Sequence, residues 1–271
     1  MGWFGAVFKD YIANKSTHLA VGLTTGYLGS LTTFSGWNQK MLDLSIGGHW
    51  VLSAVGFLLG LFLAAYSIKF GIGTAKICKS FLSCQSWDRG HSQSHWRVNT
   101  IKRHFLVTTA LALALISAWI FCLIFLIQKE FHKHNSTSQL YLACIVGPVG
   151  VWTRWRLAIR YNGRGFGKAG ALKWMKLGTL LANVSAACIM AFLAGLKKAV
   201  HTDKCDTVAS GIQLGFLGCL STVSTFISEY NAMEDGEQYR RAYVYAWTTI
   251  LVSFGLGMLF YHVPLWVKGH G

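Results

Sequence analysis

The sequence has few acidic residues and almost no proline. The 271 residues include ten Asp and Glu but 25 Lys and Arg, and only two are prolines. Only 13% of the residues are charged and 53% are apolar, whereas a typical soluble domain has about 25% charged residues. The scarcity of carboxylates leaves no catalytic constellation of acids and bases in the sequence. We therefore expect neither a soluble protein nor an enzyme.

Long runs without charged side chains are the main feature that is present. Six of them are close to the ~20 residues that a helix needs to cross a bilayer. A seventh is shorter and contains Pro148, but Trp152 and Trp155 suit its position at a membrane interface. The seven runs are Leu19–Gln39, Leu44–Ile68, Phe105–Gln128, Gln139–Thr153, Leu177–Leu196, Thr207–Ser228 and Ala242–Tyr261. The pattern predicts an all-α membrane protein with about seven transmembrane helices.

Basic residues gather in two of the predicted loops, so the net charge of +15 indicates membrane topology rather than nucleic-acid binding. The positive-inside rule places both loops and the N-terminus in the cytosol, and the sequon at Asn135 then lies outside. Whether Asn135 is glycosylated is not decided by the sequence. The first loop holds Lys69, Lys76, Lys79, Arg89, Arg97, Lys102 and Arg103, and the second holds Arg156, Arg160, Arg164, Lys168 and Lys173.

An internal repeat relates the two ends of the chain. Residues 22–37 align without gaps on residues 211–226, with seven of sixteen positions identical. Each copy precedes one further apolar run, and three runs lie between the two helix pairs, so the copies have opposite orientations. Inverted repeats of this kind commonly place an ion site near the membrane midplane, on helices that are interrupted by small and hydroxyl residues.

One Gly-rich copy alone would be explained by close helix packing. Two copies that share the same Thr and Ser cluster favour a break that frees backbone carbonyls. Such irregular backbone is tolerated at membrane depth only where protein or a polar cavity pairs it.

These motifs resemble the small fluoride channel family, whose third helix has a Gly-rich break followed by Thr-Thr-Phe-Ser-Thr-Phe. The corresponding strings here are residues 32–37 (TTFSGW) and 221–226 (STVSTF). The run from Gly147 through Gly150 to Arg154 is similar to the family's first helix, and residues 178–183 (GTLLAN) are similar to its second. The residues Tyr245, Thr249 and Ser253 fit the polar stripe of its fourth helix.

The resemblance implies a specific domain organisation. Residues 139–271 correspond to one complete four-helix channel domain, and residues 1–71 correspond to helices three and four of another. Residues 72–138 hold a cytosolic loop and a linker transmembrane helix. Counterparts of helices one and two of the first domain are absent, which leaves open a shortened product or a fragment. A second copy or a complementary fragment would then supply the missing helices.

The function implied by the resemblance is passive fluoride efflux across the plasma membrane. Fluoride is strongly hydrated, so neutral hydrogen-bond donors suit its pore better than a fixed cation that would trap it. By resemblance, Arg154, Gly147 and Gly150 are structural, and the backbone carbonyls of Gly29, Thr32, Gly218 and Ser221 hold Na⁺. The pore residues implied are Asn183, Phe34, Phe226, Tyr245, Thr249, Ser253, Thr222 and Thr33. The alternative for Asn183 is an interhelical hydrogen bond, and for the hydroxyls a bond to their own helix.

The two motif copies have lost complementary residues. The first keeps Phe34 but has Trp37 at the second Phe position, and the second has Val223 first but keeps Phe226. In the fourth helices, a gapless match sets Trp50, Ala54 and Leu58 opposite Tyr245, Thr249 and Ser253. We expect one working pore and one vestigial pore.

Two other functions are weighed against a channel. A coupled transporter usually needs a carboxylate inside the membrane, and the predicted spans place Glu229 at a helix end with every other acid in a loop. A non-conducting truncated isoform, or a protein that acts only in assembly, is the second alternative and would explain the absent helices.

Overall fold

The computed structural model describes residues 2–3, 17–87, 101–128, 136–162 and 174–269. Every regular element in these ranges is helical, which confirms the predicted all-α fold. Asn135 and the basic residues Arg89, Arg97, Arg164, Lys168 and Lys173 lie outside the described residues. The main elements are α3 (Thr17–Val21), η1 (Gly22–Leu28), α4 (Phe34–Ile46), α5 (Trp50–Trp87), α6 (Ile101–Gln128), α7 (Ser136–Asn162), α8 (Leu177–Val200), α9 (Asp203–Ile212), η3 (Gln213–Leu217), α10 (Gly218–Leu220), α11 (Val223–Asp235) and α12 (Tyr239–Gly269).

Five helical stretches of the described chain are long and apolar enough to cross a membrane. They are Trp50–Phe81, Phe105–Gln128, Leu177–Val200, Asp203–Asp235 and Tyr239–Val267. The first predicted span is divided, because Leu19–Leu28 forms a short apolar helix before a break. The weakest predicted span lies within α7, which is 27 residues long but carries three arginines in its second half.

The helix α5 is longer than the sequence predicted. The apolar run ends at Ile68, but the helix continues through Trp87. Lys69, Lys76 and Lys79 therefore lie on a helix and not in a loop, which corrects the predicted loop boundary. No proline interrupts this segment, and long cationic side chains can extend along a helix towards the membrane surface.

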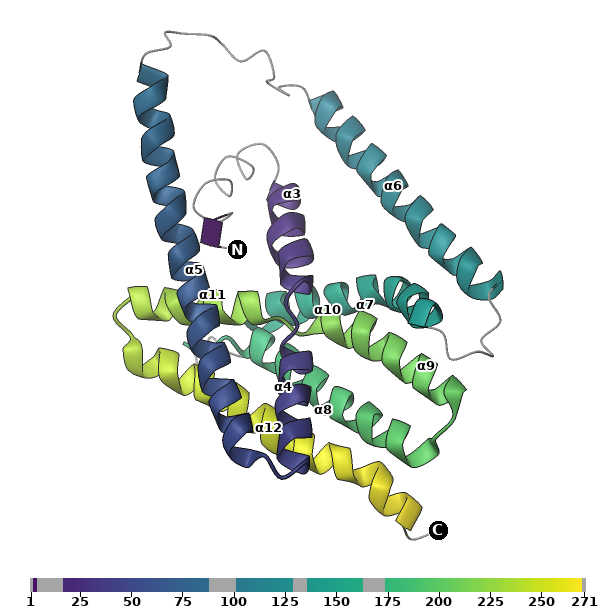
Figure 1. Cartoon of the computed structure of the whole chain (residues 1–271). Coiled ribbons are helices and arrows are strands. Elements are labelled where there is room, and N and C mark those ends of the chain that lie inside the picture. Colours follow the sequence, from purple (N-terminus) through teal and green to yellow (C-terminus); the bar gives the residue numbers. More distant parts are fainter. Residues whose placement is uncertain (1, 4–16, 88–100, 129–135, 163–173, 270–271) are drawn as a thin grey trace.

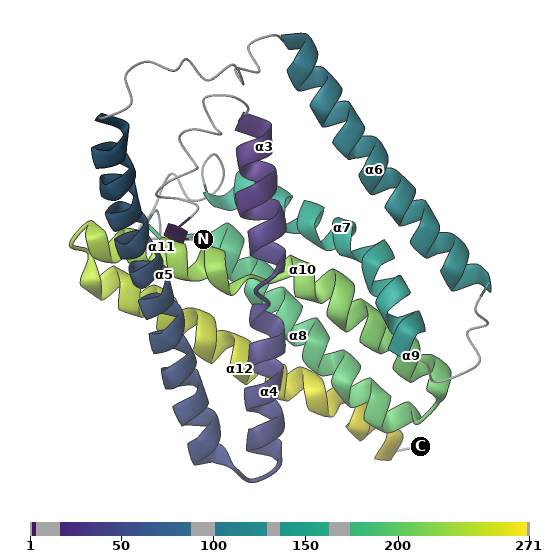
Figure 2. The ribbon, with the colours of Figure 1, turned by 45° about the horizontal axis from the view of Figure 1, so that its top comes forward.

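The predicted inverted repeat forms two interrupted helices that cross each other. The first consists of α3, the π-helical η1 and α4, and the second of α9, the π-helical η3, α10 and α11. In both, the π-helical turns occupy the Gly-rich motif, and the chain leaves the helix at the following Thr or Ser residues. Figures 1 and 2 show that the crossing point is at the two breaks, where the junction of α3 and α4 meets α10.

The second half of the chain forms a tightly packed bundle. The helices α8 and α12 run side by side, and a side chain on Gly195 would clash with the carbonyl of Tyr261. At the crossing, the core contains buried side chains of both halves, among them Phe34, Phe226, Ile227, Tyr245 and Ile250. The core therefore depends on contacts between the two repeats.

The linker helix α6 stands apart from the bundle and contacts α7 (Figure 1). The indole Nε1 of Trp119 donates a hydrogen bond to the carbonyl of Ile145 at 3.1 Å. This carbonyl lies three residues before Pro148, whose missing N–H leaves the neighbouring Cys144 carbonyl without its helical donor. The rings of Phe125 and Tyr141, 5.7 Å apart, extend the same interface.

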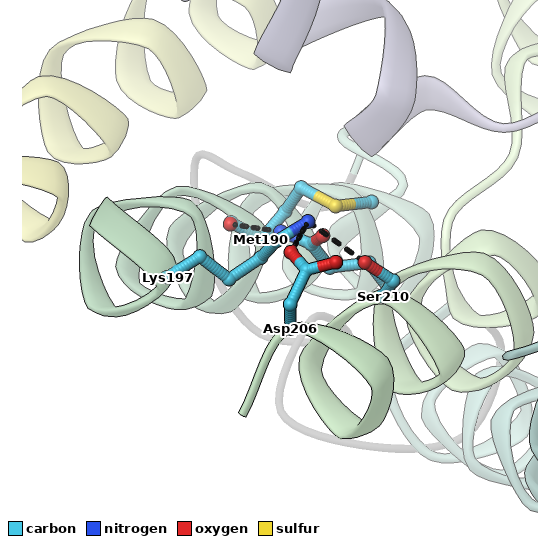
Figure 3. A network of polar contacts seen from close by, with 5 residues as sticks. Met190, Lys197, Asp206 and Ser210 are labelled. Atoms are coloured by element: carbon cyan, nitrogen blue, oxygen red, sulfur yellow. Dashed lines mark hydrogen bonds and ion pairs between the residues drawn. The ribbon is translucent and has the colours of Figure 1, made fainter. Parts of the chain in front are cut away.

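A polar network fixes the turn between α8 and α9 (Figure 3). The ammonium of Lys197 lies 2.7 Å from a carboxylate oxygen of Asp206 and donates to the hydroxyl of Ser210 at 2.7 Å. One to two turns deeper, the Gln213 side-chain amide donates to the carbonyl of Met190 at 3.0 Å. The ion pair balances the charge of Lys197, which the predicted topology places on the outer side. It also fixes the start of the second interrupted helix.

Candidate functional site

Each interrupted helix restarts with a threonine cap. The Thr33 hydroxyl accepts a hydrogen bond from the Gly36 amide at 3.4 Å, and the Thr222 hydroxyl accepts one from the Thr225 amide at 3.3 Å. Both threonines have extended backbone, as residues that precede a helix normally do. The repeated Thr-x-Ser pattern thus ends one helical segment and begins the next at the same point of each repeat.

Hydroxyl groups pair the two breaks with each other, and the bonds occur in equivalent sets. Each serine amide at the restart donates to a hydroxyl of the other repeat, and each serine hydroxyl donates to a carbonyl of the other repeat. The bonds are Ser35 N to Ser221 Oγ (3.0 Å) and Ser224 N to Thr32 Oγ1 (3.0 Å), with Ser35 Oγ to the Leu217 carbonyl (3.3 Å) and Ser224 Oγ to the Leu28 carbonyl (3.2 Å). The crossing therefore has a local two-fold pseudosymmetry.

Arg154 breaks this pseudosymmetry. The Thr32 carbonyl accepts from the Val223 amide at 3.0 Å, whereas the Ser221 carbonyl accepts from the Arg154 guanidinium at 3.4 Å. The same guanidinium also donates to the carbonyls of Thr25 and Gly26 in η1 and to the Ser30 hydroxyl. Arg154 is buried. A cation from α7 thus joins the two breaks.

Glycines with predicted structural roles lie beside this arginine. A Cβ on Gly150 would clash with the carbonyl of Phe216, so glycine is needed for α7 to approach η3. A Cβ on Gly147 would meet the Cys219 sulfur at 3.5 Å, an ordinary contact distance. A Cβ on Gly29 would lie 2.8 Å from the guanidinium of Arg154. Gly29 therefore makes room for the cation.

Asn183 binds the second break through both ends of its amide. The Asn183 Nδ2 donates to the Thr222 carbonyl at 3.1 Å, and the Thr222 amide donates to Asn183 Oδ1 at 2.8 Å. Asn183 is fully buried in α8. These contacts are interhelical hydrogen bonds, the alternative that the sequence left open, and the second N–H of the amide remains for another acceptor.

The phenylalanines of the two repeats lie together. The ring centroids of Phe34 and Phe226 are 5.9 Å apart with an angle of 69° between the planes, and Phe226 is 5.3 Å from the Tyr245 ring. All three side chains are fully buried. Trp37 contacts Phe34 on one side and Phe57 of α5 on the other.

The polar stripe of α12 points into the bundle. Tyr245, Thr249 and Ser253 are all fully buried. The Thr249 hydroxyl donates to the carbonyl of Tyr245 at 2.8 Å, and the Ser253 hydroxyl has no hydrogen-bond partner among the described residues. In the first half, the matching Trp50, Ala54 and Leu58 are exposed on α5.

Glu229 lies inside the site, which corrects its predicted place at a helix end. The predicted span stopped at Ser228, but α11 continues to Asp235 and Glu229 is in its middle. Its carboxylate accepts from the Tyr245 hydroxyl at 2.7 Å, from the Thr179 hydroxyl at 2.9 Å and from the Asn162 amide at 3.3 Å.

The sequence analysis missed this network, although two signals pointed to it. Thr179 belongs to the Gly-Thr-x-x-x-Asn string, and Glu229 follows Phe226 by three residues, which places both on one side of a helix. A carboxylate therefore lies within a helical stretch that is long and apolar enough to cross a membrane, so the absence of one no longer counts against a coupled transporter.

Comparisons with known proteins agree with these motifs. Residues 141–261 match the family described as CrcB-like protein, Camphor Resistance (CrcB). The chain is 30% identical over 135 residues to the fluoride-specific ion channel FluC 1 of Staphylococcus aureus, and the match covers 50% of the chain and 82% of that protein. No solved structure matches the chain.

Longer relatives match most of the chain. The fluoride export protein 1 of Candida albicans is 27% identical over 260 residues, covering 91% of the chain and 62% of that protein. The protein of the same name from Neurospora crassa is 26% identical over 305 residues, covering 98% of the chain and 52% of that protein. The chain thus spans less than two thirds of the length of these two relatives.

Proposed function

The chain belongs to the CrcB-like family of fluoride channels and fluoride export proteins, and on that premise we propose that it conducts fluoride passively out of the cell across the plasma membrane, with a cytosolic N-terminus. The observation that carries the proposal is the set of neutral groups buried where the two repeats cross. Tyr245, Thr249 and Ser253 offer hydroxyls along one face of α12, and Phe34 and Phe226 stand beside them.

These groups can replace the water around a small anion. The Ser253 hydroxyl has no partner among the described residues and is free to donate, whereas the Tyr245 and Thr249 hydroxyls would have to leave Glu229 and the Tyr245 carbonyl to do so. The edges of the aromatic rings are electropositive. None of these groups carries a fixed positive charge that would hold the anion too strongly for conduction. The guanidinium of Arg154, which joins the two breaks, is occupied by their carbonyl groups.

We propose a single fluoride pathway through the chain. Phe34 comes from the first repeat, and Phe226 comes from the second with the hydroxyls of α12. The pseudosymmetric pathway would combine Val223, Trp37 and the exposed apolar face of α5. That combination lacks both phenylalanines and every hydroxyl of the stripe, so we propose that it is vestigial.

The function is tested by expression in fluoride-sensitive cells that lack their own exporter. The chain should restore growth in fluoride and should leave tolerance of high chloride unchanged. Membrane abundance is measured in parallel, because only a chain that reaches the membrane tests conduction. The same test is made with the chain alone and with the co-expressed helix pair described below. If the chain reaches the membrane in normal amounts but growth is restored in neither case, the result supports the assembly-only alternative and contradicts the proposal.

We also propose that Na⁺ is held at the crossing by the carbonyls of Gly29, Thr32, Gly218 and Ser221. Carbonyl oxygens suit a hard cation. The carbonyls of Thr32 and Ser221 already accept one hydrogen bond each, and each oxygen has a second lone pair. Bound there, the ion would stabilise the two breaks against each other. We expect the thermal unfolding midpoint to rise with Na⁺ but not with a bulky organic cation. Equal midpoints in the two salts would contradict the site.

The first half exposes glycines that the second half covers. Gly211 and Gly215 pack tightly against Leu142 and Ala143 of α7. Their counterparts, Gly22 and Gly26, have no described atom within 4 Å of an added Cβ. Glycine at these positions permits close helix packing, so the open pair indicates a surface suited to another helix.

The helix α5 exposes the face that α12 buries inside the bundle. The buried positions Tyr245, Thr249, Ser253, Gly257 and Tyr261 of α12 correspond to Trp50, Ala54, Leu58, Phe62 and Tyr66 of α5. Four of these five α5 residues are more than half exposed large hydrophobics, and Ala54 is exposed as well. We propose that this face and the two glycines bind a helix pair of the α7–α8 type. In a second copy of the chain, α7 and α8 are already packed in its own bundle, which favours a complementary fragment.

The partner is tested with a tagged helix pair of residues 136–200, co-expressed with the full chain. The helix pair should copurify in a one-to-one complex with the wild-type chain. Gly73→Leu is the control, because Gly73, like Gly26, has no described atom within 4 Å of an added Cβ, and this variant should form the same complex. Gly26→Leu should abolish the complex without lowering the thermal midpoint. Equal copurification with Gly26→Leu, a complex of two full chains instead, or no complex with the wild type would each contradict this occupant.

A further inference from the structure

Two buried polar side chains near the α12 stripe have no hydrogen-bond partner among the described residues. Asn38 lies in α4, one helical turn after Phe34, and both ends of its amide are unpaired. Ser253 lies in α12, and its hydroxyl is unpaired as well. Both residues are fully buried.

The Asn38 amide faces α12 at Gly257, one helical turn from Ser253. The Asn38 Nδ2 is 3.3 Å from the position of a Cβ on Gly257. Gly257 follows Ser253 by one turn, and residues four apart on a helix have Cβ atoms about 5–6 Å apart. The Asn38 amide thus lies about one helical turn from Ser253. An anion that accepts two hydrogen bonds of about 2.8 Å can bridge donors up to about 5.6 Å apart, so it could reach both groups.

We propose that Asn38 and Ser253 form an anion subsite between α4 and α12, and that its ligand is a small, desolvated monovalent anion. The inference rests on the proposed fluoride pathway and adds a residue of the first repeat to it. Asn38 supplies an amide N–H and Ser253 supplies a hydroxyl, so the subsite is neutral. Leu42 and Ala191 also approach Gly257 and limit the space, which favours fluoride over larger anions.

Packing alone does not require polar residues here. An unpaired buried amide is unfavourable, and an apolar residue of the same size would normally be more stable. The pseudosymmetric positions carry such residues, because Ile227 corresponds to Asn38 and Leu58 corresponds to Ser253. Ile227 is fully buried in the core. The crossing can therefore be built with an apolar residue, and the polar pair occurs only beside the proposed pathway.

The subsite also fits the position of the rings. Phe34 precedes Asn38 by four residues on α4, and Tyr245 and Thr249 precede Ser253 on α12. An anion that leaves the edges of Phe34 and Phe226 would next meet these two donors. The subsite thus extends the proposed pathway of neutral groups by one helical turn.

The first experiment uses Asn38→Leu, which keeps a similar volume but removes the amide. Fluoride efflux from proteoliposomes should fall about tenfold or more, because the hydrogen bond to a charged ligand is lost. The thermal midpoint without fluoride should stay the same or rise. Ser253→Ala should also lower efflux, and the double variant should be little worse than either single variant, since both remove one site. The control is Thr207→Val, which removes another buried, unpaired hydroxyl and should leave efflux unchanged.

A second measurement separates the subsite from conduction. The thermal unfolding midpoint of the purified wild-type protein is measured in NaF and in NaCl at equal concentration. NaF should raise the midpoint of the wild type and of Thr207→Val but not that of Asn38→Leu. An NaF effect without efflux would retain the subsite and reject the proposed function. An equal NaF effect in Asn38→Leu, no effect in the wild type, or a lower midpoint of Asn38→Leu without fluoride would overturn the subsite.

Discussion

The structure depends on the pairing of backbone groups where the two interrupted helices cross. Each break frees amides and carbonyls, and such groups are tolerated at membrane depth only when the protein pairs them. Hydroxyls of each repeat bind the backbone of the other, Asn183 binds both sides of Thr222, and Arg154 binds carbonyls of both breaks. Removal of one repeat would leave the other with unpaired polar groups in its core. The two halves therefore share one set of hydrogen bonds at the crossing.

The crossing also explains the asymmetry of the chain. It places Phe34 beside Phe226 and Tyr245, so the proposed pathway has a ring from each repeat and the polar face of α12. The related positions on the other side carry Val223, Trp37 and the apolar face of α5. The two repeats share the hydrogen bonds that hold the breaks. The backbone motif is therefore needed in both copies, although the side chains around it differ.

The sequence predicted those features that depend on local residue patterns. The Gly-rich motif and its Thr and Ser residues predicted both helix breaks, and the order of apolar runs predicted the inverted repeat. It did not predict that α5 continues past Ile68, because the lysines there suggested a loop. It predicts Glu229 at the end of a span, because charged residues usually lie outside the membrane core, whereas three donors from other elements surround the carboxylate. The contacts of Arg154 and the unpaired amide of Asn38 depend on helices distant in sequence, so no local pattern could reveal them.

Fluoride efflux from proteoliposomes at matched protein amounts tests the single-pathway account most directly. The account predicts that Phe34→Ile and Phe226→Ile each abolish most of the flux, because isoleucine fills similar space without an electropositive ring edge. Trp37→Phe and Val223→Ala should leave the flux nearly intact. Equal sensitivity at all four positions would mean two working pathways. Loss of flux only at Trp37 and Val223 would show that the anion follows the other side of the crossing.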